Sequence, residues 1–382
     1  MANSISHSNK ASQARIATNI LFFLNGLSFA SWASRIPDVK EYLKLGDAAL
    51  GSVLFAMPIG SLSALPVAGI IINRFGSRKI ALLSIFFYVV SMPLLGSATA
   101  TLQLAIALFL FGFGGDLLNI SMNVQAVNVE KITQRSIMSS FHAIFSIGFM
   151  VGAALGGVIA DNKISVFHHL SYVGMADLLI GLMIFRFLVK SDQQIDEDQP
   201  LFALPDRGLI LLGVIAFCGM LSEGAMADWS TLYYKQVLGT SKGFTTAGFT
   251  AFSAMMVLGR IFGDSIVKQI GLRKTLLINC IILFSGILIA LVFTHPIAVI
   301  IGFGITGLGL STIVPLIYSE AGHSKTMSAG VALAAITTVG MGGFLLGPVL
   351  IGFLSEYSSL RVALSSLIIL GMLGAFLTTK IR

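Results

Sequence analysis

Residues 74–79 read Arg-Phe-Gly-Ser-Arg-Lys, and residues 269–274 read Gln-Ile-Gly-Leu-Arg-Lys. A glycine, an arginine and a lysine therefore recur at a spacing of 195 positions. The same spacing carries Gly112 and Gly114 onto Gly307 and Gly309, and Gly148, Gly152, Gly157 and Asp161 onto Gly343, Gly347, Gly352 and Glu356. One constant spacing over three separate regions indicates an internal repeat, with one copy in each half of the chain.

Long apolar runs lie on both sides of each basic loop. The 382 residues are 55% hydrophobic and 11% charged, whereas a soluble domain carries about 25% charged residues. About 20 apolar residues carry a helix across the hydrocarbon core, so the runs predict twelve transmembrane helices. Because the runs lack the alternation of barrel strands, the predicted class is an all-α membrane protein. Their approximate ranges are 15–36, 48–73, 79–98, 101–129, 136–160, 166–189, 207–235, 245–268, 273–294, 296–320, 326–354 and 360–380.

One stretch between the sixth and seventh runs is polar, acidic and proline-containing. It covers residues 190–207 and reads KSDQQIDEDQPLFALPDR, which is typical of a linker between bundles. Residues 1–14 are polar and lack the apolar core of a signal peptide, so the first run is expected to remain as the first helix. The predicted organisation is a disordered cytoplasmic tail over 1–14, a six-helix bundle over 15–189, a cytoplasmic linker over 190–207 and a pseudo-symmetric six-helix bundle over 208–382.

Lysine and arginine in the connecting segments predict the orientation, because cytoplasmic loops carry an excess of both. With the N-terminus in the cytoplasm, sixteen of these residues fall on the cytoplasmic side and seven on the opposite side. Both termini are therefore expected to be cytoplasmic.

Together these features resemble the major facilitator superfamily over essentially the whole chain. Twelve helices, a repeat of six plus six, a long central loop and basic G-x-R-K loops after the second and eighth helices carry the resemblance. Within the superfamily, a MosC-like group of bacterial inner-membrane proteins, distantly similar to fucose-type sugar permeases, is indicated by Ser31-Trp32-Ala33-Ser34-Arg35, Phe141-His142 through Gly148, Glu223-Gly224 and Asp228-Trp229. The resemblance implies a monomeric carrier in the bacterial inner membrane that works by alternating access.

The loop after the second helix departs from the superfamily pattern. That pattern usually has Asp three residues before the glycine matched by Gly76, where this chain has Asn73. The resemblance therefore does not imply a charge-paired gate of the usual kind. For His142, at the start of the fifth helix, a capping role and a gate or proton relay are both open. The gating candidates are Asn73, Arg74, Gly76, Arg78, His142, Arg260 and Asp264, of which Arg260 is expected to snorkel or to pair with Asp264 one turn on.

Three carboxyls are candidates for proton coupling, because ionisable groups inside a bilayer are costly and tend to be functional. Asp116 lies near the middle of the fourth predicted helix, and Glu223 lies similarly deep in the seventh. Asp228 is nearer the outer surface. The alternative for Asp116 is a polar contact between helices, and the alternative for Asp228 is a solvated carboxylate.

Polar and aromatic residues on the same helices are candidates for contacting the solute. Asn119 and Asn123 share the helix face of Asp116, by their i, i+3 and i+7 spacing. The two tryptophans lie toward the outer ends of the first and seventh helices, where an aromatic belt is the alternative explanation. The substrate-binding candidates are Asn25, Ser28, Trp32, Asn119, Asn123 and Trp229.

The sequence thus predicts a secondary active transporter of a small hydrophilic, sugar-like solute, coupled to protons. Its expected partners are the solute, protons and membrane lipid. A proton antiporter that exports drugs or metabolites is an alternative, favoured by a glycine-rich run in the fifth helix, and a non-transporting membrane receptor is another. The six scattered histidines indicate no metal site, and no cofactor, nucleic-acid binding or enzymatic activity is expected.

Overall fold

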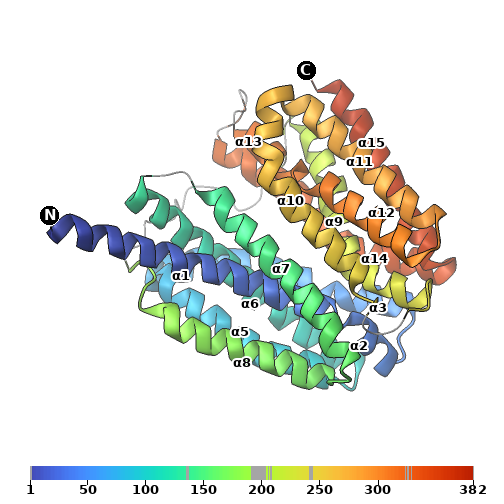
Figure 1. Cartoon of the computed structure of the whole chain (residues 1–382), viewed down its shortest axis with the longest axis horizontal. Coiled ribbons are helices and arrows are strands. Elements are labelled where there is room, and N and C mark those ends of the chain that lie inside the picture. The colour runs from blue at the N-terminus through green and yellow to red at the C-terminus, as the bar shows by residue number, and fades with distance from the viewer. Residues whose placement is uncertain are drawn as a thin grey trace. The chain divides into compact units, whose positions relative to one another are not determined.

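The computed structural model describes residues 2–134, 137–190, 204, 206, 209–240, 244–322, 324, 327 and 329–381 (Figure 1). Every regular element in those ranges is an α-helix, which confirms the all-α prediction. Eleven described helical segments are long and apolar enough to cross a membrane. The predicted eighth span corresponds to α10 (Ala247–Ile270), in which Ala247–Gly263 forms a shorter apolar segment.

The chain forms two compact units. The N-terminal unit comprises residues 1–35 and 56–197, and the C-terminal unit comprises residues 36–55 and 198–382. The N-terminal unit contains α1 (Ala2–Ala33), α4 (Ala56–Phe75), α5 (Ser77–Ser97), α6 (Thr101–Thr133), α7 (Met138–Asp161) and α8 (Val166–Phe185). The C-terminal unit contains α2 (Ile36–Tyr42), α3 (Asp47–Leu54), α9 (Ile210–Gln236), α10 (Ala247–Ile270), α11 (Leu272–Val292), α12 (Pro296–Leu310), α13 (Ile313–Gly322), α14 (Ala329–Tyr357) and α15 (Leu360–Lys380).

These bounds differ from the predicted organisation in two places. Residues 36–55 pack with the C-terminal unit, although the sequence assigns them to the bundle over 15–189. Residues 2–14 of the predicted tail continue α1, since neither Gly nor Pro interrupts the helix there. The predicted linker over 190–207 lies outside the described residues, apart from positions 190, 204 and 206.

Residues 36–55, named here the docked segment, are held within the C-terminal unit by α9 and α14. Glu356 of α14 accepts hydrogen bonds from the backbone N–H groups of Asp47 and Ala48 at 2.6 and 3.2 Å. The neighbouring Ser355 hydroxyl donates to the Asp47 carboxylate. A carboxylate at the first turn of a helix meets the unpaired N–H groups and the positive end of the helix dipole. These contacts fix the start of α3 against the end of α14.

The same pattern of helix packing occurs inside each unit. In the N-terminal unit, α1 packs on α7, α4 on α6, and α5 on both α6 and α8. In the C-terminal unit, α9 packs on α14, α10 on α12, and α11 on both α12 and α15. Each pair in the first set has its counterpart in the second at the spacing of the sequence repeat.

The two basic loops share one backbone conformation. Gly76, between α4 and α5, has φ of 87°, and Gly271, between α10 and α11, has φ of 83°. The Gly76 amide donates to the Ile72 carbonyl at 2.8 Å, and the Gly271 amide donates to the Val267 carbonyl at 2.9 Å. Only glycine adopts this region without strain, so it can end one helix and begin the next within a single residue.

Glycines also set how closely two pairs of helices approach. A Cβ built on Gly112 of α6 would lie 2.0 Å from the Met57 carbonyl oxygen of α4. At the repeat-related position, a Cβ on Gly307 of α12 would lie 2.1 Å from the Phe252 carbonyl oxygen of α10. Small residues that allow such backbone contact are typical of membrane helices, where packing replaces the hydrophobic drive.

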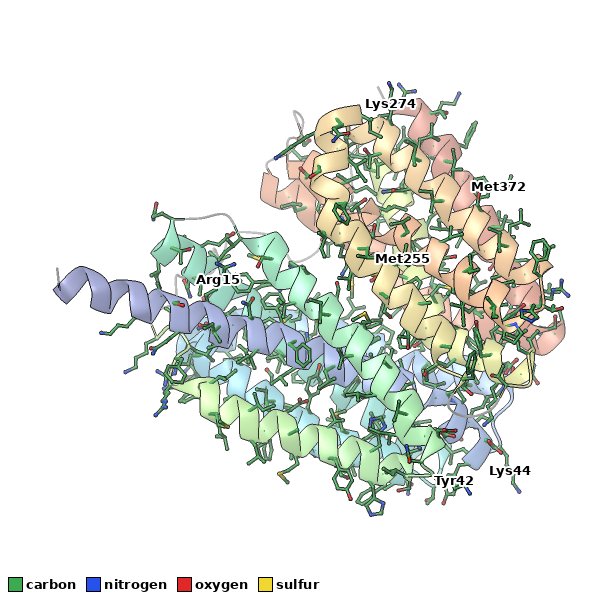
Figure 2. All side chains as sticks on the ribbon, in the orientation of Figure 1. Arg15, Tyr42, Lys44, Met255, Lys274 and Met372 are labelled. Atoms are coloured by element: carbon green, nitrogen blue, oxygen red, sulfur yellow. The ribbon has the colours of Figure 1, made fainter. Side chains whose placement is uncertain are left out.

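The outer faces of the helices carry exposed apolar side chains (Figure 2). On α15, Ile369, Met372 and Phe376 are exposed, and Met372 is labelled in the figure. In water, so many exposed large apolar groups would be an aggregation liability. They suit helices whose outer faces meet the hydrocarbon of a bilayer.

Candidate functional site

Asp116 and two asparagines form a hydrogen-bonded series along α6. The Asn119 side-chain amide donates to Asp116 Oδ1 at 3.4 Å. The Asn123 amide donates to the backbone carbonyl of Asn119 at 2.7 Å and to its side-chain oxygen at 3.1 Å. The three side chains therefore share one face, as their spacing predicts, and each is partly exposed.

Asn25 and Ser28 of α1 make contacts inside the N-terminal unit. The Tyr88 hydroxyl of α5 donates to Asn25 Oδ1, and Asn25 Nδ2 lies 3.9 Å from the Met122 sulfur of α6. One turn further along α1, Ser28 Oγ donates to Asp177 Oδ2 of α8. Both predicted substrate contacts thus join α1 to the helices around it.

Asp177 and Tyr88 are not among the residues that sequence reasoning selected. Both are buried, with exposed fractions of 0% and 1%. A Cβ on Gly115 would lie 2.9 Å from the Tyr88 hydroxyl, so this hydroxyl lies against α6 beside Asp116. The signal for Asp177 was present, because it is a lone acid inside a membrane-length apolar run, the same criterion that selects Asp116.

Glu223 and Arg260 form an ion pair in the C-terminal unit. Arg260 Nη2 of α10 lies 3.6 Å from Glu223 Oε1 of α9, and Arg260 Nε donates to the Ser311 carbonyl at 3.3 Å. The sequence instead expects Arg260 to snorkel or to pair with Asp264, whose side chain lies outside the described residues. The structure therefore brings together two residues for which the sequence predicts separate roles.

Asp228 and both tryptophans are buried. Asp228 exposes 3% of its surface, so the alternative of a solvated carboxylate does not fit this structure. Trp32 exposes 1% and Trp229 is fully buried, and the indole N–H of each lacks a hydrogen-bond partner. An aromatic belt at the lipid interface would leave both rings exposed, so the structure does not support that explanation.

Three of the predicted gating residues of the N-terminal unit, Arg74, Arg78 and His142, pack against aromatic rings. The Arg78 guanidinium lies 4.1 Å from the centre of the Phe185 ring of α8, and Arg74 lies 5.3 Å from that of Phe75. The His142 ring of α7 meets Phe22 of α1 edge-on, at 5.3 Å between ring centres. These contacts hold the basic loop to α8 and the start of α7 to α1.

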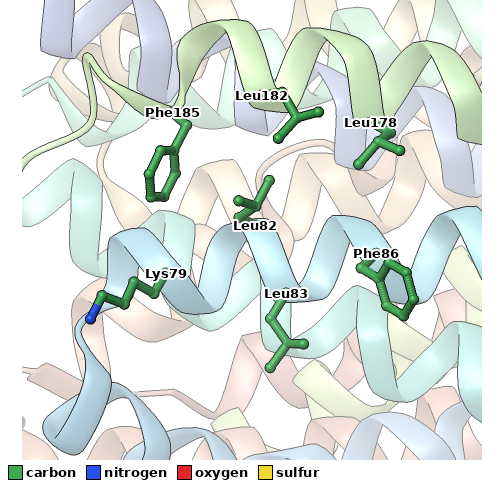
Figure 3. A pocket seen from close by; sticks show the side chains of 7 residues that line it. All are labelled: Lys79, Leu82, Leu83, Phe86, Leu178, Leu182 and Phe185. Atoms are coloured by element: carbon green, nitrogen blue, oxygen red, sulfur yellow. The ribbon is translucent and has the colours of Figure 1, made fainter.

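A groove of about 390 Å³ runs between α5 and α8 (Figure 3). It is apolar except for Lys79 at one end. A hydrophilic solute finds almost no hydrogen-bonding group there, so the groove suits a hydrocarbon chain and not the predicted solute. Its lining residues are Lys79, Leu82, Leu83, Phe86, Leu178, Leu182 and Phe185.

Metal-ligating side chains do not gather anywhere in the described residues. No group of three or more His, Cys, Asp or Glu side chains there could hold a metal ion. The two cysteines, Cys218 and Cys280, are both free and buried.

Comparisons with known proteins give consistent matches. The family model of the Major Facilitator Superfamily matches residues 18–342. An uncharacterized MFS-type transporter of Yersinia pestis is 36% identical over 351 residues, covering 91% of each chain. The membrane protein MosC of Rhizobium meliloti is 31% identical over 370 residues, covering 97% of this chain and 90% of MosC. Among solved structures, the nucleoside transporter NupG matches with a TM-score of 0.75 at 12% identity, covering 96% of this chain and 98% of that one.

Proposed function

The chain belongs to the major facilitator superfamily, and on that premise we propose that it is a proton-coupled secondary transporter of a small hydrophilic solute. It is a multi-pass membrane protein that moves a small molecule across the membrane, and it is not an enzyme. In the proposal, the membrane is the bacterial inner membrane, both termini are cytoplasmic, the carrier is a monomer and the solute is sugar-like. The similarity to fucose-type permeases stays a prediction.

One observation carries the proton coupling. Each unit has a carboxyl on a membrane-spanning helix with a partner whose hold a bound proton would weaken. Asp116 has the Asn119 amide, and Glu223 has the Arg260 guanidinium. A proton on Glu223 removes the charge that Arg260 pairs with, and a proton on Asp116 replaces a charge-assisted hydrogen bond by a neutral one. Gain and loss of a proton can thereby change the ion pair between α9 and α10 and the hydrogen bonding along α6.

The polar groups beside these carboxyls support a hydrophilic solute. The amides of Asn119 and Asn123 are partly exposed and have further hydrogen-bonding capacity. A buried donor without a partner costs about 1–3 kcal/mol, and the indole N–H groups of Trp32 and Trp229 are such donors. A hydroxyl group of a sugar-like solute that reaches either indole N–H can accept a hydrogen bond from it.

Proton movement in proteoliposomes loaded with a pH-sensitive dye tests the proposal. A panel of sugars, polyols, amino acids and cationic drugs is added across the membrane, and the internal pH is followed. In the wild type, a hydrophilic solute is expected to move protons, and Asp116→Asn and Glu223→Gln are expected to abolish this movement. Asp161→Asn, at the exposed end of α7, is the matched control and should behave as wild type.

Each other outcome counts against the proposal in a specific way. Labelled solute that enters without proton movement makes the protein a uniporter or a carrier coupled to another ion. Proton movement with cationic drugs alone favours export, the second candidate. That candidate is supported by the glycine-rich run of α7, where a Cβ on Gly152 would lie 2.5 Å from the Leu27 carbonyl oxygen of α1. If the protein is folded but moves neither solute nor protons, the result favours a non-transporting membrane receptor.

A further inference from the structure

Asp177 lies near the middle of α8, a helix of membrane-spanning length. It is the twelfth of the twenty residues of Val166–Phe185, roughly 17 Å along the helix. Its neighbours Leu178 and Leu182 line the apolar groove between α5 and α8. Asp177 instead points toward α1, where it meets Ser28.

Only one of the two carboxyl oxygens of Asp177 has a hydrogen-bond partner. Oδ2 accepts a hydrogen bond from Ser28, whereas Oδ1 is buried and has no hydrogen-bond partner. Among the described residues, no Lys, Arg or His forms an ion pair with Asp177. The titratable group near Asp177 on α5 is Tyr88, whose hydroxyl donates to Asn25. Neither α1 nor α7 gives Asp177 an ionisable contact within the described part of the chain.

A charged carboxylate is expensive in such a place. Burying an ion costs several kcal/mol unless opposite charge or several hydrogen bonds compensate it, and one hydroxyl donor is a small compensation. A bound proton removes the charge. Because the Ser28 hydroxyl can both donate and accept, the contact with α1 persists in the neutral form but loses its charge-assisted strength.

The consequence of this change falls on α1. Ser28 lies one turn from Asn25, which is bonded to Tyr88 of α5. A proton at Asp177 therefore weakens the link from α8 to α1, while the link from α5 remains. The same helix carries Trp32, one of the predicted solute contacts, one turn beyond Ser28.

We infer that Asp177 is a further proton-binding residue of this transporter, joined through Ser28 to the helix that carries Asn25 and Trp32. The inference rests on the proposed proton coupling for its role in transport. Proton binding itself can be measured without any solute.

The first experiment is an infrared titration of the purified full chain in lipid, which follows the carbonyl stretch of protonated carboxyl groups. The wild type is expected to show a component that grows and disappears reversibly with pH. This component should be missing from Asp177→Asn and retained in Asp161→Asn. A spectrum of Asp177→Asn that titrates as the wild type does would overturn the inference.

A second variant, Ser28→Ala, tests the inference even if Asp177→Asn does not fold. Ser28→Ala removes the hydroxyl that contacts the carboxyl but leaves the acid in place. Because the charged form depends more on that donor than the neutral form does, the pH midpoint of the same component is expected to move. An unchanged midpoint would contradict the link from Asp177 to α1.

Transport measurements on Asp177→Asn then distinguish a failure of this inference from a failure of the proposed function. Solute-driven proton flux is expected to fall about a hundredfold in Asp177→Asn, as for other lost proton-transfer groups, while exchange of labelled for unlabelled solute continues. Unchanged proton flux in Asp177→Asn would refute the role in coupling. If the wild type moves no protons with any solute, the proposed function fails, yet the infrared component still decides whether Asp177 binds a proton.

Discussion

Arg260 Nη2 of α10 lies 3.6 Å from Glu223 Oε1 of α9, so a guanidinium and a carboxylate on two neighbouring helices of the C-terminal unit form an ion pair. The side chains expose 20% and 32% of their surfaces. Such partial burial gives the pair more weight than a surface salt bridge, whose contribution is about 0–1 kcal/mol. It also means that a change at either residue acts on the other.

The first prediction concerns this coupling. Glu223→Gln and Arg260→Gln are each expected to lower the thermal stability of the purified protein, because each removes one side of this ion pair. The double variant should lose less than the sum of the two, by about 0.5–3 kcal/mol in a double-mutant cycle. Thermal unfolding followed by circular dichroism in detergent measures all four proteins. Strictly additive losses would mean that the two side chains do not interact.

The second prediction concerns the close contact between α4 and α6. Gly112→Ala places a methyl group 2.0 Å from the Met57 carbonyl oxygen, so the helices must separate, at a cost of about 1–3 kcal/mol. Gly69→Ala, in α4, is the matched control, because nothing lies within 4 Å of its Cβ. That variant should be neutral or more stable by up to about 1 kcal/mol, since Ala favours helix over Gly. Equal effects of the two substitutions would show that the contact is not tight.

The third prediction concerns backbone conformation alone. A Cβ on Gly271 meets nothing within 4 Å, but φ there is 83°. Gly271→Ala should therefore destabilise the protein by about 1–3 kcal/mol through backbone strain, without any clash. Thermal unfolding of this variant beside Gly69→Ala separates the two causes. A neutral Gly271→Ala would show that the loop does not require its positive φ.

Much of this fold could be predicted from the sequence, because the deciding signals are local. Apolar runs of membrane length predict the helices whatever their partners are. The spacing of 195 positions predicts that Gly76 and Gly271 are equivalent, and their φ angles of 87° and 83° agree with it. The shared face of Asp116, Asn119 and Asn123 likewise follows from helical periodicity.

The contacts that give these residues their chemistry could not be predicted in the same way. Arg260 pairs with Glu223 on another helix, and no local spacing in the sequence indicates that ion pair. Ser28 and Asp177 are separated by 149 positions, and nothing in a single sequence pairs them. The docked segment follows the first predicted span directly, but its partner Glu356 lies 309 positions after Asp47.

The fourth prediction concerns that docked segment. Glu356→Ala removes the acceptor of the Asp47 and Ala48 amides, so hydrogen exchange at these two amides should become faster by about tenfold, as expected for the loss of roughly 1.4 kcal/mol of helix capping. Tyr357→Ala changes the adjacent, 88% exposed side chain and is the control. Exchange of peptides covering residues 36–55, followed by mass spectrometry, measures the effect. Exchange that stays at the wild-type rate would show that Glu356 does not hold α3.

The most direct test of proton coupling is the accumulation of a labelled neutral solute in proteoliposomes under an imposed pH gradient. We expect the wild type to concentrate the solute above its external level, whereas Asp116→Asn and Glu223→Gln should not exceed that level. Asp161→Asn should accumulate solute as the wild type does. Accumulation by the wild type that stops at the external concentration, with or without the gradient, would contradict the account.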